Sequence, residues 1–267
     1  MPSLKLNAKT LVIDLLLAAS DRPITIKQLI AAAQLFDISD NQIRVATTRL
    51  CRENKIESIS RGTYQLAQQS HDWADIIINR QNGVLKTKAW QQQYIAIFSN
   101  SLGRVDRTAL TRRERALKRF GFKELEQGIF IRPDNIALTL DDIFNALVNT
   151  GLESTVKIAL IHSFDEKTQQ LIPELWDTSK LENNYIKYNT IIEKWILEYP
   201  HLNILDAAKQ SFLLGRETIA LLMMDPLLPE PFVDTNLRNT FIHNVTELDQ
   251  IGLKIWNTLN AEYSKSD

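Results

Sequence analysis

The apolar positions at the N-terminal end of the chain recur with helical spacing in successive segments. Residues 4–19 carry the first such pattern, and Asp21-Arg22-Pro23 ends it because proline cannot continue a helix. Thr25 is placed to cap a second helix over residues 26–35, since a threonine hydroxyl can accept a hydrogen bond from the first helical turn. The pattern therefore predicts two helices before residue 36.

A third segment begins with a strong helix-start signal. Ser39 suits an N-cap, and Gln42 stands three residues further on, where its side chain can close a capping box. Ile43, Ala46 and Leu50 then occupy the i, i+3 and i+7 positions of one helix face. We expect this face to pack against the first two helices.

A short hairpin is predicted directly after the third helix. Residues 56–59 alternate like a strand, Ser60-Arg61-Gly62 makes a tight turn, and residues 63–66 return as a second strand. Three helices followed by a hairpin is the element order of a winged helix-turn-helix, which we predict for residues 1–70.

The polar side of the third helix has the composition of a DNA-reading surface. Arginine can donate two hydrogen bonds to guanine, glutamine can pair with adenine, and threonine can reach a phosphate or a thymine methyl group. Because residues near the start of a groove helix usually contact bases, we assign base contacts to Gln42, Arg44 and Thr48. The other cations are assigned to phosphates, and the one at the hairpin turn to phosphate or the minor groove. The predicted DNA-binding residues are Gln42, Arg44, Thr48, Arg49, Arg52, Lys55 and Arg61.

Strands and helices alternate in the middle of the chain. After a connecting helix over residues 68–80, the predicted order over residues 89–170 is β-α-β-β-α-β, which is that of a ferredoxin-like domain. The elements are a strand at 94–98, a helix at 106–119, strands at 122–126 and 129–131, a helix at 140–149 and a strand at 156–162.

The last part of the chain is predicted to be all helix. Helices are expected over residues 181–197, 204–224 and 239–263, and the proline-rich stretch 225–231 separates the last two. The Trp and Tyr residues recur here at helical spacing, which is more typical of a core or a dimer interface than of a ligand site. The predicted fold class is therefore α+β, with domains at 1–70, 89–170 and 171–267 and a linker at 71–88.

Charge divides the chain into a basic and an acidic half. Residues 1–119 hold 19 Lys and Arg against 10 Asp and Glu, whereas residues 120–267 hold 12 against 22. A basic half indicates a polyanionic partner. The single cysteine, Cys51, excludes an internal disulfide framework and is typical of a cytoplasmic protein. The apolar run at residues 11–19 is interrupted by Asp14 and is shorter than the ~20 residues that a membrane span needs.

Four stretches of the sequence match one family in order along the chain. They are ISDNQIRVATTRLCRENKIES at 38–58, RRERALKRFGFKELEQGIFIRPDN at 112–135, LWD at 175–177 before a Tyr-rich helix, and DPLLP at 225–229. With these stretches the chain resembles the PaaX family of transcriptional regulators, which repress phenylacetic acid catabolism genes. The resemblance implies a winged helix, a middle domain similar to a small CRISPR-associated ferredoxin-like nuclease, and a helical C-terminal domain. It also implies a homodimer on a palindromic operator, released by a CoA thioester such as phenylacetyl-CoA.

The arginine-rich helix over residues 106–119 is the candidate effector site. We expect an anionic, acyl-CoA-like ligand whose phosphates bind this helix. The same side chains suit DNA phosphates, an acidic surface of this protein, or a solvated face paired locally with Glu114. The predicted effector-binding residues are Arg112, Arg113, Arg115 and Arg119.

Two other functions compete with a DNA-binding repressor. The winged helix can instead be the docking surface of a protein-interaction adaptor, or the middle domain can be a nuclease. A nuclease needs carboxylates that hold a divalent ion, and Phe98-Ser99-Asn100 at the end of the first middle strand has none. The histidines show no metal-ligand spacing; they are His71, His162, His201 and His243. We therefore predict a protein that is not an enzyme and that needs no metal or cofactor.

Overall fold

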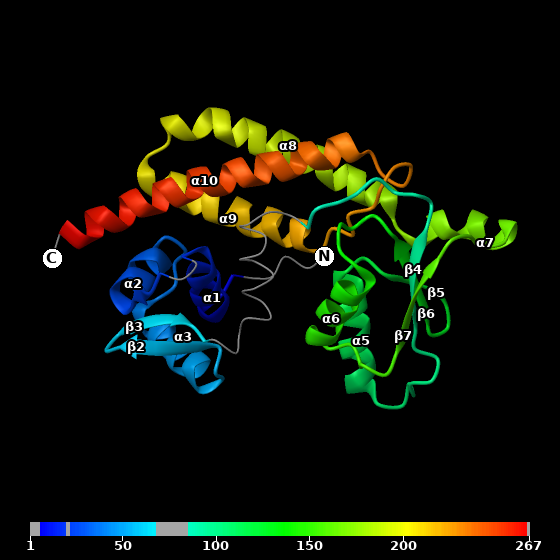
Figure 1. Cartoon of the computed structure of the whole chain (residues 1–267). Helices are drawn as coiled ribbons and strands as arrows, with labels where there is room; N and C mark the ends of the chain where they lie inside the picture. Colours follow the sequence, from blue (N-terminus) through cyan, green and yellow to red (C-terminus); the bar gives the residue numbers. More distant parts are fainter. Residues whose placement is uncertain (1–5, 20–21, 68–84, 266–267) are drawn as a thin grey trace. The chain divides into compact units, whose positions relative to one another are not determined.

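The computed structural model describes residues 6–19, 22–67 and 85–265, and it is α+β, as predicted (Figure 1). Two small antiparallel sheets lie in the first two thirds of the chain, and the C-terminal region is helical. The helix predicted over residues 68–80 lies outside the described residues. Within the described ranges, no helix combines the length and the apolar character that crossing a bilayer requires.

The chain forms two compact units. Unit 1 comprises Met1–Val84, Lys194–Glu217 and Thr246–Asp267, and unit 2 comprises Leu85–Glu193 and Thr218–Val245. Three long helices contribute residues to both units; they are α8 (Thr178–Glu198), α9 (Ile204–Met223) and α10 (Thr235–Lys265). The helical region predicted after residue 171 is thus divided between the units.

Unit 1 begins with three helices and a small sheet. The elements are α1 (Ala8–Ala18), β1 (Ile24–Thr25), α2 (Ile26–Gln34), α3 (Asp40–Arg52), β2 (Ile56–Ser60) and β3 (Thr63–Leu66), and the sheet order is β1-β3-β2. Thr25 and Ser39 cap α2 and α3 through capping boxes, which confirms both predicted helix starts. These caps satisfy backbone N–H groups that a helix start otherwise leaves unpaired.

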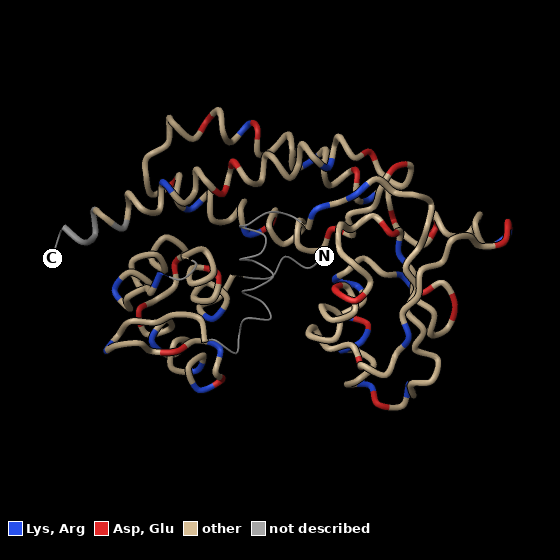
Figure 2. The backbone as a smooth tube through the Cα atoms, in the orientation of Figure 1, with Lys and Arg blue, Asp and Glu red and all other residues tan. Residues whose placement is uncertain are grey.

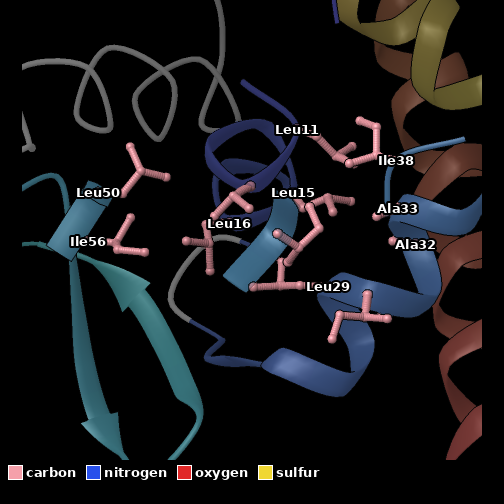
Figure 3. Close-up of a cluster of buried hydrophobic side chains, with 12 residues drawn as sticks. Leu11, Leu15, Leu16, Leu29, Ala32, Ala33, Ile38, Leu50 and Ile56 are labelled. Atoms are coloured by element: carbon pink, nitrogen blue, oxygen red, sulfur yellow. The ribbon is translucent and has the colours of Figure 1, made fainter. Parts of the chain in front are cut away.

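The first core of unit 1 lies between these helices and the sheet. Figure 3 shows labelled side chains of α1, α2, α3 and β2 gathered in one cluster, including Leu11, Leu29 and Leu50, which are each 0% exposed. Burying one such leucine contributes about 1.5–3 kcal/mol. Phe212 of α9 and Trp256 of α10 pack against the same cluster. Helices far along the sequence therefore contribute to the core of unit 1.

Unit 2 is built on a four-stranded antiparallel sheet of order β5-β6-β4-β7. Its elements are β4 (Tyr94–Phe98), α5 (Arg107–Arg119), β5 (Lys123–Glu126), β6 (Ile129–Pro133), α6 (Leu140–Asn149) and β7 (Lys157–Ile161). These agree with the predicted strands and helices to within one residue, apart from β6, which ends two residues later than predicted. The order of elements along the chain is that predicted for residues 89–170.

Both faces of this sheet are covered. Ile95 and Ile97 of β4 pack with α5 and α6, whereas Tyr94 and Ala96 face a cluster that includes Ile172, Trp176, Leu228 and Val233. Successive strand residues point to opposite faces, so a strand buried on both sides must be apolar throughout. This explains the unbroken apolar run of β4.

A buried polar network joins three sequence stretches in unit 2. Arg132, 1% exposed, donates hydrogen bonds to the carbonyls of Phe120 and Pro133 and to Asn135 Oδ1, and Asn135 Nδ2 donates to the Leu227 carbonyl at 2.6 Å. Burial lowers the pKa of Arg132 to about 9. Gly121 (φ +75°) permits the close approach, since a Cβ there would lie 2.8 Å from the Pro226 carbonyl oxygen. The Gly-Phe, Arg-Pro-Asp-Asn and Asp-Pro-Leu-Leu-Pro stretches therefore meet in one place.

Candidate nucleic-acid interface

Helix α3 divides cleanly into a buried and an exposed side. The predicted inward face is confirmed, since Ile43, Ala46 and Leu50 are at most 3% exposed. Thr47 is buried beside them. The remaining side chains of α3, apart from the half-buried Cys51, are exposed. Because α3 packs through its buried side, its other side is left exposed and is polar apart from Val45.

Four exposed arginines give this surface its charge. Basic positions recur along α3 and at the turn of the hairpin that follows it (Figure 2). Their guanidinium groups have no hydrogen bond or ion pair with another residue in the described ranges. These arginines are Arg44, Arg49, Arg52 and Arg61. Because no carboxylate in the described ranges pairs with these guanidinium groups, they are available to bind an external anion such as a phosphate.

Lys55 differs from the arginines because it has a carboxylate neighbour. Its Nζ lies 3.5 Å from Glu53 Oε2, and Lys9 Nζ lies 2.5 Å from Glu53 Oε1. The hydrogen bond from Lys9, followed by the charges of both lysines, holds the pKa of Glu53 below its usual range. Glu53 therefore stays ionised and offsets part of the positive charge of Lys55.

Two of the predicted base readers already make hydrogen bonds within the helix. Gln42 Oε1 accepts from the Ser39 backbone N–H at 2.9 Å and from Ser39 Oγ at 3.1 Å. Thr48 Oγ1 donates to the Arg44 carbonyl at 2.9 Å, which leaves its methyl group and its oxygen lone pairs exposed. Gln42 is thus part of the helix start, whereas Thr48 still presents contact atoms.

The hairpin is short and its turn is tied to the helices. The Ile26 backbone N–H at the start of α2 donates to the Gly62 carbonyl at 2.7 Å. Gly62 has φ +76°, a conformation that glycine adopts readily, and only Arg61 and Gly62 connect the paired residues Ser60 and Thr63. A register shift between Ser58 and Ser60 leaves Ile59 unpaired and 48% exposed.

Sequence reasoning missed two exposed residues of α3. Asn41 lies three residues before Arg44, and Val45, 40% exposed, lies directly after it. At 100° per residue both fall within the exposed sector that also contains Thr48 and Arg52. The same helical spacing that predicted the buried side of α3 also places Asn41 and Val45 on its exposed side, so the sequence carried a signal for them.

The four arginines of α5 that were predicted to bind an effector differ in their burial and pairing. Arg113 is 4% exposed and forms a two-pronged ion pair with Glu153, with Nε–Oε2 at 3.0 Å and Nη2–Oε1 at 2.8 Å. This pairing raises the pKa of Arg113 and lowers that of Glu153. Arg113 therefore has its counter-charge within the protein. Arg112 and Arg115 are exposed, and Arg119 is half-buried.

A small cavity of about 280 Å³ lies beside the end of β4 in unit 2. Its polar lining includes Asn100, Arg104, Arg113 and Glu124, and Arg104 Nη1 donates to Glu124 Oε1 at 3.1 Å. Of the four arginines predicted to bind an effector, Arg113 alone lines this cavity.

The end of β4 is held by hydrogen bonds to the carbonyls of Gln127 and Gly128. The Ser99 backbone N–H donates to the Gly128 carbonyl at 2.7 Å, and Asn100 Nδ2 donates to the Gln127 carbonyl at 2.9 Å. Within the described ranges, His, Cys, Asp and Glu side chains form no group of three that could hold a metal ion.

Comparison with known proteins shows a likeness to a solved structure. No family model matches the chain, and no curated protein matches it. An uncharacterized protein, Rv0674 from Mycobacterium tuberculosis, has a similar solved structure, with a TM-score of 0.60 and 21% sequence identity. The match covers 93% of this chain and 98% of that chain, so the likeness extends over nearly the whole fold. At this identity it concerns the fold alone.

Proposed function

We propose that this protein is a sequence-specific DNA-binding transcriptional repressor, in which residues 6–67 are a winged helix-turn-helix and α3 is the helix that enters the major groove. The observation that carries the proposal is the exposed side of α3, with Arg44, Arg49 and Arg52 unpaired. The element order α1-β1-α2-α3-β2-β3 supports it. So does the basic excess of residues 1–119.

The resemblance to the PaaX family supplies the finer part of the proposal. We infer a ferredoxin-like middle domain, which the β-α-β-β-α-β order and the β5-β6-β4-β7 sheet support. The protein is proposed to act as a homodimer on the operator of a phenylacetate-type catabolic operon. An acyl-CoA such as phenylacetyl-CoA releases it from DNA. On α5, Arg112 and Arg115 are the exposed candidates for the phosphates of that effector.

Selection of genomic fragments tests the proposal directly. The full chain is mixed with sheared DNA of its source genome, and the retained fragments are sequenced. We expect enrichment of a palindromic site next to catabolic genes, loss of enrichment in Arg44→Ala, and release of the fragments by phenylacetyl-CoA. Lys157→Ala, an exposed cation of unit 2, is the matched control and should retain enrichment. Fragments recovered without any common sequence would refute specific DNA binding.

A protein-interaction adaptor is the second candidate. Val45 and Ile59 are 40% and 48% exposed on α3 and β2, and exposed apolar side chains also suit a protein partner. An adaptor predicts that Arg44→Ala keeps its partner while the wild-type chain fails to retain any specific DNA. Co-purification of the wild-type and variant chains with their partners separates the two functions.

A further inference from the structure

The capping box leaves Gln42 poorly suited to adenine. Pairing with adenine in the major groove requires an amide that accepts from N6 and donates to N7 at once. The Gln42 oxygen instead accepts two hydrogen bonds from Ser39, at 2.9 and 3.1 Å. Contact with adenine would thus compete with the bonds that start the helix.

Asn41 has the free amide that Gln42 lacks. It is exposed in the first turn of α3, and its side chain makes no hydrogen bond with the rest of the described chain. It precedes Arg44 by three residues and Thr48 by seven, so the three side chains lie along one stripe of the helix. Residues in this part of a groove helix are those that usually reach base edges.

Val45 adds an apolar group to the same surface. It is 40% exposed between charged and polar neighbours, so part of its apolar surface is open to a partner. The methyl group of thymine is the apolar feature of the major groove. Asn41 and Val45 are four residues apart, about 6 Å along the helix axis, which corresponds to about two base-pair steps.

We propose that Asn41 and Val45 are specificity-determining residues of the DNA site, and that Gln42 is a capping residue. Asn41 pairs with an adenine, Val45 contacts a thymine methyl group within two base pairs of it, and Arg44 pairs with a neighbouring guanine. This inference rests on the proposed function. It predicts half-sites that combine A·T pairs with a guanine.

Selection from a randomised duplex library tests the assignment with the full chain. In Asn41→Ala the preference for adenine at one position should fall by roughly 5- to 150-fold, the discrimination expected of one two-bonded contact. Asn41→Asp keeps the size of the side chain and should change the preference there from adenine to cytosine, because a carboxylate accepts from the cytosine amino group. Gln34→Ala, which removes an exposed amide of α2, should leave the consensus unchanged.

Base analogues then test the contacts atom by atom. Replacing the adenine by 7-deazaadenine, which lacks the N7 acceptor, should weaken DNA binding by the wild-type chain but not by Asn41→Ala. Replacing thymine by deoxyuridine, which lacks the methyl group, should lower the DNA affinity of the wild-type chain by about fourfold. The affinity of Val45→Ala should not change.

The outcomes separate this inference from the function beneath it. A wild-type consensus that is unchanged in Asn41→Ala and Asn41→Asp overturns the inference and leaves the repressor function standing. Loss of the adenine preference in Gln42→Ala, with normal stability, would also overturn it. If the wild-type chain selects no consensus at all, the repressor function fails and this assignment fails with it.

Discussion

Replacing Gln42 by alanine distinguishes a residue that starts α3 from one that reads DNA. The substitution removes the two hydrogen bonds that Gln42 Oε1 accepts from Ser39, at 2.9 and 3.1 Å. Exposed hydrogen bonds lie at the lower end of the usual range, so the expected loss is about 0.5–1 kcal/mol of unfolding free energy. For a chain of this length that corresponds to a fall in melting temperature of about 1–4 °C.

Helix α2 provides a matched control for this experiment. Thr25 and Gln28 form the same capping box, with the Thr25 backbone N–H and Oγ1 at 2.9 and 3.0 Å from Gln28 Oε1. Gln42→Ala and Gln28→Ala should therefore lower the melting temperature by similar amounts. Neither variant should change which DNA sequence is preferred.

Thermal melting and binding to the recovered site measure the two effects separately. Both variants are expected to bind the site and its single-base changes in the same rank order as the wild-type chain. A Gln42→Ala chain that melts like wild type but no longer distinguishes adenine from guanine would refute the capping assignment. It would restore the base-reading role that the sequence alone suggested.

Three further predictions concern charge and packing. Lys55→Ala should weaken DNA binding less than Arg52→Ala, because Glu53 already offsets the charge of Lys55; affinity titrations of both variants check this. Glu153→Gln should cost about 2–3 kcal/mol by denaturant unfolding at pH 7, because it leaves the guanidinium of Arg113 buried without its counter-charge. The pKa of Glu153 is lowered in the folded chain. The stability difference between the wild-type chain and Glu153→Gln should therefore have its full size above the pKa of an unfolded glutamate, and it should disappear as the pH falls through the folded pKa. Gly121→Ala should destabilise the chain by at least about 1 kcal/mol, since a Cβ there meets the Pro226 backbone at a positive φ; the same unfolding experiment measures it.

Local signals predicted the elements because the forces involved are local. Thr25 and Ser39 start their helices through side chains three residues away, and the apolar period placed Ile43 and Leu50 in the core. The strand predicted at 94–98 is β4, and its unbroken apolar run fits the burial of both of its faces.

The features that sequence reasoning missed depend on distant residues or on competing roles. Arg113 is buried because Glu153, forty residues away, neutralises it, although its helical position beside Leu117 gave a partial signal. The Arg132 network depends on the carbonyl of Pro226, which no local pattern connects with β6. Gln42 carried two signals, for capping and for base reading, and the structure shows the hydrogen bonds of the capping role.

Binding of the full chain to two duplexes across a salt series shows whether α3 reads DNA sequence. One duplex carries the recovered site and the other the same bases in scrambled order, from 50 to 200 mM salt. We expect the chain to bind the site at least about 1,000-fold more tightly than the scrambled duplex at physiological salt. The double variant Arg49→Gln, Arg52→Gln should lower the slope of log K against log salt concentration by about 1.8, because each lost phosphate contact removes about 0.9. Equal affinity for both duplexes at every salt concentration would contradict the claim that α3 reads DNA sequence.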